Sequence, residues 1–147
     1  MTMNVDIVSE RQRVLDEAHS WIGTPYHHAA RKKGVGVDCA QLLIAVYQNA
    51  GIHRFSEPEA YPPDWMTHRN DSRFLAWISD WCITVETPEA GDVALFRYGR
   101  GPSHGAIMID KRYMIHSYSI SRRVEVREID FMIERLAGYW SPKRWHP

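Results

Sequence analysis

Cys39 is the residue whose surroundings first indicate chemistry. It stands after a glycine-punctuated loop in the stretch GVGVDCAQLL, residues 34–43. Asp38 and Gln41 have the types and spacing of a capping box, so the stretch predicts a helix that begins at Cys39. The partial positive charge at a helix start stabilises a thiolate, which suits a nucleophile. Free cysteines are more often small buried hydrophobic residues, however, and Cys39 alone leaves both interpretations open.

Two histidines are candidates for the base and the orienting group that a thiol nucleophile requires. His104 opens one predicted strand, SHGAIMID, and His116 lies within the next, YMIHSYS. If the turn comprises residues 110–112, residue 109 pairs with 113, and both histidines lie on one face of the sheet, diagonal to each other. A two-residue turn would put them on opposite faces. Alone, His104 fits a strand-end surface residue and His116 a core histidine, so the catalytic interpretation requires an odd-length turn or a bulge.

Helical periodicity precedes strand-like alternation along the chain. Apolar residues recur at helical spacing over 9–22, 39–50 and 74–81, and a last short helix is expected over 130–136. The strand-like segments are short, β-branched or alternating: WCITVET, DVALFRY, HGAIMID, RYMIHSYSI and RRVEVREI. Helices followed by strands are typical of an α+β domain with a mainly antiparallel sheet, and 147 residues suit a single domain, 1–147.

Two segments show no such regular pattern. Residues 52–72 contain three prolines and many polar groups, which predicts a long surface loop. The tail GYWSPKRW is expected to trail off after the last helix.

Composition restricts the class of protein. The chain is 44% hydrophobic and its 18 basic residues balance 18 acidic ones, so we expect a folded chain and no general binding of nucleic acid. Its two cysteines, Cys39 and Cys82, are too few for a disulfide scaffold, and Cys82 fits a core strand position. His27 and His28 match no known ligand set with Cys39, so no metal or cofactor is expected.

The ordered segments WIGTPY, GVGVDCAQLL, PEAGDVALF, SHGAIMI and YMIHSYS resemble the NlpC-type cell-wall cysteine peptidases. The resemblance spans about residues 21–119, extends to the tail motif LAGYWSP, and is closest to the small phage-associated branch. It implies a circularly rearranged papain-like fold. It also implies hydrolysis of an amide bond in peptidoglycan stem peptides, most often the bond between D-glutamate and the diamino acid.

Site residues follow from this resemblance position by position. Cys39 matches the family nucleophile, His104 the general base and His116 the polar residue that orients the imidazole. Tyr26, in GTPY, matches a tyrosine that lies beside the nucleophile. Because His116 must be neutral to accept a hydrogen bond from His104, we expect activity to fall below about pH 6.5.

The substrate is expected to lie along four residues: Asp38, Ser103, Gly105 and Arg31. Asp38 matches the acid before the cysteine and also reads as a helix cap, whereas Arg31 belongs to a charged loop that equally fits a solvated surface. The sequence departs from the family pattern in three places. Ala40-Gln41 replaces Ser-Gly, HHAARKKG replaces a glycine pair, and Gly105 stands where valine is common. These departures bear on the shape of the groove and the bond cleaved.

Two other functions are compatible with the sequence, one that uses the same catalytic residues and one that does not require them. A papain-like acyltransferase or transglutaminase would keep Cys39 and His104 but pass the acyl group to an amine. A non-catalytic phage tail component would retain the fold alone, and other phage tail proteins are then expected partners. The first residues, MTMNVDIVSERQRV, lack a signal-peptide pattern, and no apolar stretch would span a membrane. We therefore expect synthesis in the bacterial cytoplasm, with the protein carried in a virion tail or released to the wall.

Overall fold

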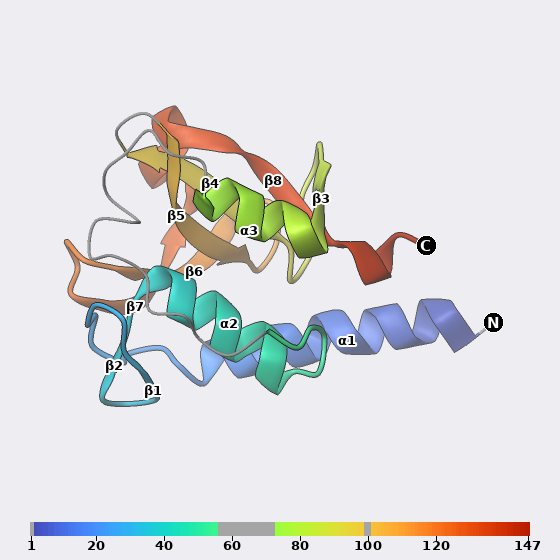
Figure 1. Ribbon diagram of the computed structural model, residues 1–147, viewed down its shortest axis with the longest axis horizontal. Coiled ribbons are helices and arrows are strands. Elements are labelled where there is room, and N and C mark those ends of the chain that lie inside the picture. Colours follow the sequence, from blue (N-terminus) through green and yellow to red (C-terminus); the bar gives the residue numbers. More distant parts are fainter. Residues whose placement is uncertain (1, 56–72, 99–100) are drawn as a thin grey trace.

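The computed structural model describes residues 2–55, 73–98 and 101–147 (Figure 1). Its α-helices are α1 (Thr2–His19), α2 (Cys39–Asn49) and α3 (Arg73–Trp81). Two short 3-10 helices, η1 (Ile129–Arg135) and η2 (Lys143–Trp145), lie near the C-terminus. The predicted loop over 52–72 falls mostly outside the described residues.

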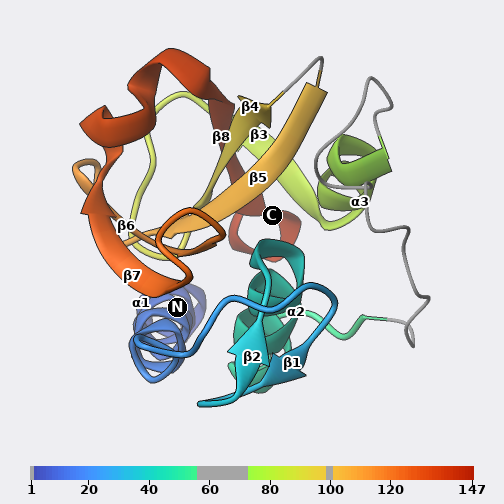
Figure 2. The ribbon, with the colours of Figure 1, turned by 90° about the vertical axis from the view of Figure 1, so that its left-hand side faces the viewer.

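A six-stranded sheet forms the body of the molecule, in the order β3-β8-β4-β5-β6-β7. Its neighbouring strands all pair antiparallel. Its strands are β3 (Cys82–Val85), β4 (Val93–Tyr98), β5 (Gly101–Met108), β6 (Tyr113–Tyr118), β7 (Arg123–Glu128) and β8 (Leu136–Pro142). A separate hairpin, β1 (Arg31–Lys32) and β2 (Gly36–Val37), lies beside α2 (Figure 2). The predicted α+β fold with an antiparallel sheet is confirmed.

The C-terminal segment differs from the sequence prediction. The tail that was expected to trail off contains β8, which pairs with both β3 and β4 inside the sheet. The sequence LAGYWSP does not predict a strand, because it contains Gly138 and ends in Pro142, and both residue types are disfavoured in strands. The expected helix over 130–136 is instead η1, whose helical geometry breaks at Met132.

Side chains along each strand point alternately to the two faces of the sheet, and both faces are buried. Odd-numbered strand residues such as Leu95, Ile107 and Ile115 belong to the main core, together with side chains of α1 and α2. Even-numbered residues such as Phe96 and Met108 form a second cluster with residues of η1. Both faces are covered, which explains why the central strands read as nearly continuous apolar runs.

Helix α2 packs directly on β5 and β6 and so brings its first turn to the sheet. Leu42, Leu43 and Val46 are fully buried on this face, and each stabilises the contact by about 1.5–3 kcal/mol. Gly105 permits the close approach, since a Cβ there would lie 3.0 Å from Leu43 Cδ1 and 3.3 Å from Phe74 Cζ. None of the helices in the described residues is long and apolar enough to cross a membrane.

Candidate active site

The start of α2 is fixed by a buried carboxylate. Asp38 is the N-cap, and its side chain accepts hydrogen bonds from the backbone N–H of Gln41 at 2.8 Å and of Ala29 at 2.7 Å. The predicted helix start at Cys39 is therefore confirmed. The carboxylate joins the helix to the preceding loop and is fully buried. This geometry assigns Asp38 to capping, and its contact with a substrate stays a prediction.

The Cys39 thiol lies against the backbone on both sides of His104. Its Sγ is 3.9 Å from the carbonyl oxygen of Ser103, and the backbone N–H of Gly105 also bonds to the sulfur. Burial raises the pKa of the thiol far above its usual value, and the charge of Asp38 raises it further. Backbone N–H groups of Gly105, Ala40 and Cys39 itself oppose this increase. Burial therefore favours the protonated thiol, whereas the neighbouring backbone N–H groups favour the thiolate.

His104 and His116 are hydrogen-bonded to each other, with 2.8 Å between His104 Nε2 and His116 Nδ1. The register that brings them together is the predicted one. Ile107 pairs with Ile115, and the N–H of Ile109 donates to the carbonyl of Tyr113 at 2.8 Å, so residues 110–112 form a three-residue turn.

Both histidines are neutral at physiological pH. Burial lowers the pKa of His104 well below its usual value, and the neighbouring His116 lowers it further. Burial lowers the pKa of His116 to about 3, with a contribution from the positive charge of Arg127. The sequence analysis expects activity to fall below about pH 6.5, whereas burial of His116 predicts that this proton uptake occurs at much lower pH.

Glu125 extends the chain of hydrogen bonds and was missed by the sequence analysis. It lies on β7 directly opposite His116, and its Oε2 is 3.0 Å from His116 Nε2. Ser121 Oγ and Arg127 Nε donate to the same oxygen, at 3.0 and 2.9 Å. Glu125 is nearly buried, with 8% of the residue exposed. The signal in the sequence is an acidic residue at the centre of the alternating segment RRVEVREI.

Two tyrosines, also not predicted, surround the imidazoles. Tyr118 stacks on His116 with ring centroids 4.9 Å apart, and Tyr98 packs edge-on to His104 at 6.0 Å. Their hydroxyls are 3.1 Å apart. Both line a pocket of about 330 Å³ beside His104, together with residues of η1: Asp130, Phe131, Met132, Ile133, Glu134 and Arg135.

The other predicted site residues lie at different distances from the chemistry. Tyr26 is half-buried, and its backbone forms a β-bridge with Val37. Burial raises the pKa of Tyr26, and the charges of Cys39 and Asp38 raise it further, which places its side chain near the thiol. Ser103 is buried and donates through Oγ to the carbonyl of Tyr98 at 3.3 Å. Arg31 is exposed on β1. Contact of these residues with a substrate stays a prediction.

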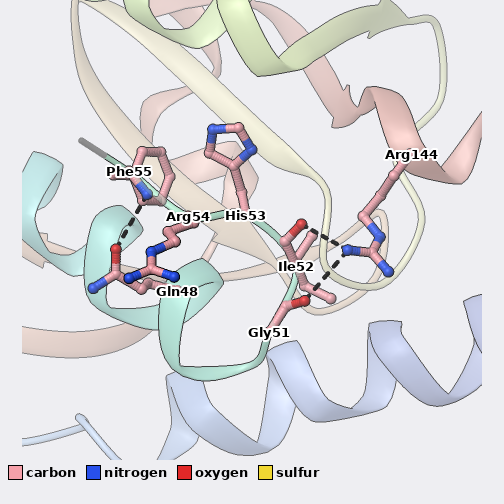
Figure 3. A pocket seen from close by; sticks show the side chains of 7 residues that line it. All are labelled: Gln48, Gly51, Ile52, His53, Arg54, Phe55 and Arg144. Atoms are coloured by element: carbon pink, nitrogen blue, oxygen red, sulfur yellow. Dashed lines mark hydrogen bonds between the residues drawn. The ribbon is translucent and has the colours of Figure 1, made fainter.

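A larger pocket of about 550 Å³ lies at the other end of α2 (Figure 3). It is lined by Gln48, Gly51, Ile52, His53, Arg54, Phe55 and Arg144. Arg144 Nη1 donates to the carbonyls of Gly51 and Ile52, at 3.3 and 3.0 Å (Figure 3). No member of the Cys39–His104–His116 set lines this pocket, so size alone does not identify the reactive site. Within the described ranges, no three His, Cys, Asp or Glu side chains gather as metal ligands would.

Three solved structures illustrate the similarity of the fold. The NlpC/p60 domain of the peptidoglycan hydrolase SagA aligns with a TM-score of 0.61 and 20% identity, covering 89% of this chain and 97% of that one. An NlpC/P60 family protein from Bacillus cereus aligns at 0.65 and 24%, over 88% and 39%. The peptidoglycan hydrolase RipB from Mycobacterium tuberculosis aligns at 0.60 and 16%, over 90% and 63%. This chain thus spans less than two thirds of the latter two structures, and the likeness concerns the fold.

A comparison with curated protein sequences finds no match. The sequence model of the NlpC/P60 family, in contrast, matches residues 23–143. This span contains the cap, the thiol, both histidines and Glu125. Because the match covers most of the chain, this protein belongs to the NlpC/P60 family, whose members are cysteine peptidases that hydrolyse peptidoglycan.

Proposed function

We propose that this protein is a cysteine peptidase that hydrolyses an amide bond in the stem peptides of peptidoglycan. The proposal depends on one arrangement: His104 and His116 are hydrogen-bonded to each other, and the Cys39 thiol contacts the strand backbone next to His104. Burial of a cysteine alone has no such meaning, because structural cysteines are also buried. A base next to the thiol and a partner that orients the base are what nucleophilic catalysis requires.

The first chemical step starts from a neutral thiol and a neutral imidazole. His104 Nε2 is engaged by His116, which leaves Nδ1 to take the thiol proton. As this proton moves, the sulfur bonds to the substrate carbonyl carbon and the carbonyl π electrons move to the oxygen. The N–H of Cys39, at the positive end of α2, stabilises the oxyanion. The imidazolium that forms on His104 retains its hydrogen bond to His116.

The second step returns the proton. The oxyanion re-forms the carbonyl as the carbon–nitrogen bond breaks, and His104 protonates the departing amine. A thioester on Cys39 remains. Water attacks this thioester with His104 as base, which releases the carboxylic acid and restores the thiol.

The bond between D-glutamate and the diamino acid is the proposed site of cleavage. The pocket beside His104 supports this choice, since it combines the cationic Arg135 with the acidic Asp130 and Glu134. A diamino acid carries both a carboxylate and an ammonium group, so a pocket of mixed charge suits it. Tyr98, whose ring lies 4.3 Å from the Arg135 guanidinium, connects this pocket to the imidazole.

Digestion of purified sacculi tests the activity and the bond together. We expect mass analysis to show new fragments ending in D-glutamate, and the Cys39→Ala variant to release none. An added amine should not appear in the products, because water is the proposed acceptor. Absence of fragments from walls with either common diamino acid, in a sample whose circular dichroism shows a folded protein, would contradict the proposal.

Association with phage particles is proposed on the sequence resemblance alone, and so is delivery from the cytoplasm to the wall. Mass spectrometry of purified particles provides the check for the first of these. Peptides of this chain in the particles are expected, in proportion to known tail proteins. Their absence from the particles, with the chain present in the host cytoplasm, would contradict it.

A further inference from the structure

Glu125 is a buried acid whose position is set by β-sheet register. It faces His116 across the β6–β7 pair, and one carboxylate oxygen accepts hydrogen bonds from His116, Ser121 and Arg127. Arg127 is itself held over the ring of Phe131, with its guanidinium 3.9 Å from the centroid. The carboxylate is thus held by neighbours on β7 and on the turn before it.

The direction of the His116–Glu125 hydrogen bond determines the tautomer of His116. An ionised carboxylate can only accept, so His116 Nε2 must carry the proton. A neutral imidazole has a single N–H, so Nδ1 of His116 is an acceptor, and His104 Nε2 must be the donor. The single N–H of His104 is thereby used, and its Nδ1 is left as the proton acceptor that the mechanism needs.

The opposite arrangement would block the chemistry. If His116 carried its proton on Nδ1, it would donate to His104 Nε2, and His104 would carry its own proton on Nδ1. That nitrogen could not accept the proton of Cys39. The chain of hydrogen bonds therefore has an active direction and an inactive one, and only an acceptor at position 125 selects the active one.

We propose that Glu125 is a positioning residue that sets the tautomers of both histidines and so makes His104 competent as the base. The groups around His116 are His104 from β5, Glu125 and Arg127 from β7, and the ring of Tyr118. Glu125 is the one acceptor-only group among them. This inference rests on the proposed hydrolase function, but its structural part concerns proton positions that can be observed without a substrate.

The tautomer is measured by NMR of ¹⁵N-histidine-labelled protein at pH 7, where each ring nitrogen reports whether it bears a proton. We expect Nε2–H for both His116 and His104 in the native protein. In Glu125→Gln, the amide can donate as well as accept, so the His116 nitrogens should shift toward a mixture of tautomers. Native His116 protonated on Nδ1, or nitrogen shifts unchanged by Glu125→Gln, would overturn the proposal.

Kinetics provide the second readout. Glu125→Gln should lower kcat for sacculus hydrolysis by about 10- to 100-fold with little change in KM. Glu128→Gln is the matched control, because Glu128 is an exposed residue of the same strand that pairs with Arg112, and it should keep native activity. In a His116→Asn background, Glu125→Gln should have no further effect on kcat, since the amide of asparagine has no tautomer to set.

Full activity of Glu125→Gln, or an equal loss on top of His116→Asn, would overturn the role of Glu125. An inactive native protein with Nε2–H tautomers would instead contradict the hydrolase function and leave the proton arrangement supported. Thermal unfolding of each variant separates these results from loss of structure.

Discussion

The two cysteines of this chain are alike in exposure and differ in their surroundings. Neither Cys39 nor Cys82 forms a disulfide, both are 2% exposed, and burial raises the pKa of both. Cys82 opens β3, next to the charges of Asp92 and Lys143. Cys39 opens α2, where backbone N–H groups reach its sulfur and His104 follows the carbonyl that it contacts.

The comparison identifies what separates the proposed nucleophile, Cys39, from a core cysteine in this molecule. Neither exposure nor thiol pKa distinguishes the two sulfurs. Cys39 differs from Cys82 in that backbone N–H groups are directed at its sulfur. It also lies near a proposed base, His104, whose hydrogen bonds are fixed by His116 and Glu125. We therefore attribute the proposed reactivity of Cys39 to the chain of hydrogen bonds beside it.

Removal of the base should have the largest effect on the difference between the cysteines. We expect His104→Ala to lower the hydrolysis rate by at least about 10³-fold, because no group remains to take the thiol proton. The rate at which iodoacetamide alkylates Cys39 should fall toward that of Cys82 in the same sample. His19→Ala, at the exposed end of α1, is the control and should change neither rate. Activity of His104→Ala within tenfold of the native value would remove His104 from the mechanism.

Replacement of the orienting residue should have a smaller and graded effect. In His116→Asn, the amide oxygen can still accept from His104 Nε2, so we expect kcat to fall by about 10- to 100-fold. His116→Leu leaves that N–H buried and unpaired, and the loss should be greater. Initial rates on sacculi measure both variants. Equal rates for the two variants would mean that His116 does not act through this hydrogen bond.

The pH dependence should also differ between hydrolysis, which we attribute to Cys39, and alkylation of Cys82. Because both histidines stay neutral well below pH 6.5, hydrolysis should be nearly constant from pH 5.5 to 8. Alkylation of Cys82 should instead rise with pH, as its thiolate fraction grows. Initial rates and alkylation rates across this range provide the check. A loss of hydrolysis centred near pH 6.5 would contradict the buried, neutral state of His116.

Stability should respond to pH where activity does not. The pKa of His116 is about 3 in the folded protein and about 6.5 in the unfolded chain, so the unfolded chain binds more protons between these values. The stabilisation is complete above pH 6.5 and is lost as pH falls toward 3, at up to about 1.4 kcal/mol per pH unit for this residue. Urea unfolding from pH 7 to 5 measures the slope, which His116→Asn should reduce. An equal slope in both proteins would place the proton uptake elsewhere.

A last effect, on stability and on the position of the helix, is expected where α2 meets β5. Gly105→Ala adds a Cβ 3.0 Å from Leu43 Cδ1, which should cost about 1–3 kcal/mol and displace the helix that carries Cys39. Thermal unfolding and initial rates measure this, and Leu43→Val in the same chain should recover part of the loss. Unchanged stability of Gly105→Ala would show that the contact has room to relax.

Local patterns in the sequence were sufficient for part of the site. The cap residue Asp38 predicts the helix start at Cys39, because capping depends on neighbours in the chain. The two-residue periodicity of strands turns a three-residue turn into a prediction that His104 and His116 meet. Both predictions require only short-range geometry, and the structure confirms both.

The remaining features depend on contacts between distant segments. Glu125 reads as a solvent-facing charge within its strand, and only pairing with β6 buries it against His116. Tyr98 becomes a wall of the site because its strand pairs with β5. Likewise, β8 has the composition of a loop and becomes a strand because β3 and β4 provide partners on both sides.

The most direct test of the central claim is to digest sacculi with two matched variants, Cys39→Ala and Cys82→Ala, and to identify the fragments by mass. If the chain of hydrogen bonds beside Cys39 makes it the nucleophile, Cys82→Ala releases the same fragments as the native protein and Cys39→Ala releases none. Release of those fragments by Cys39→Ala would contradict this account.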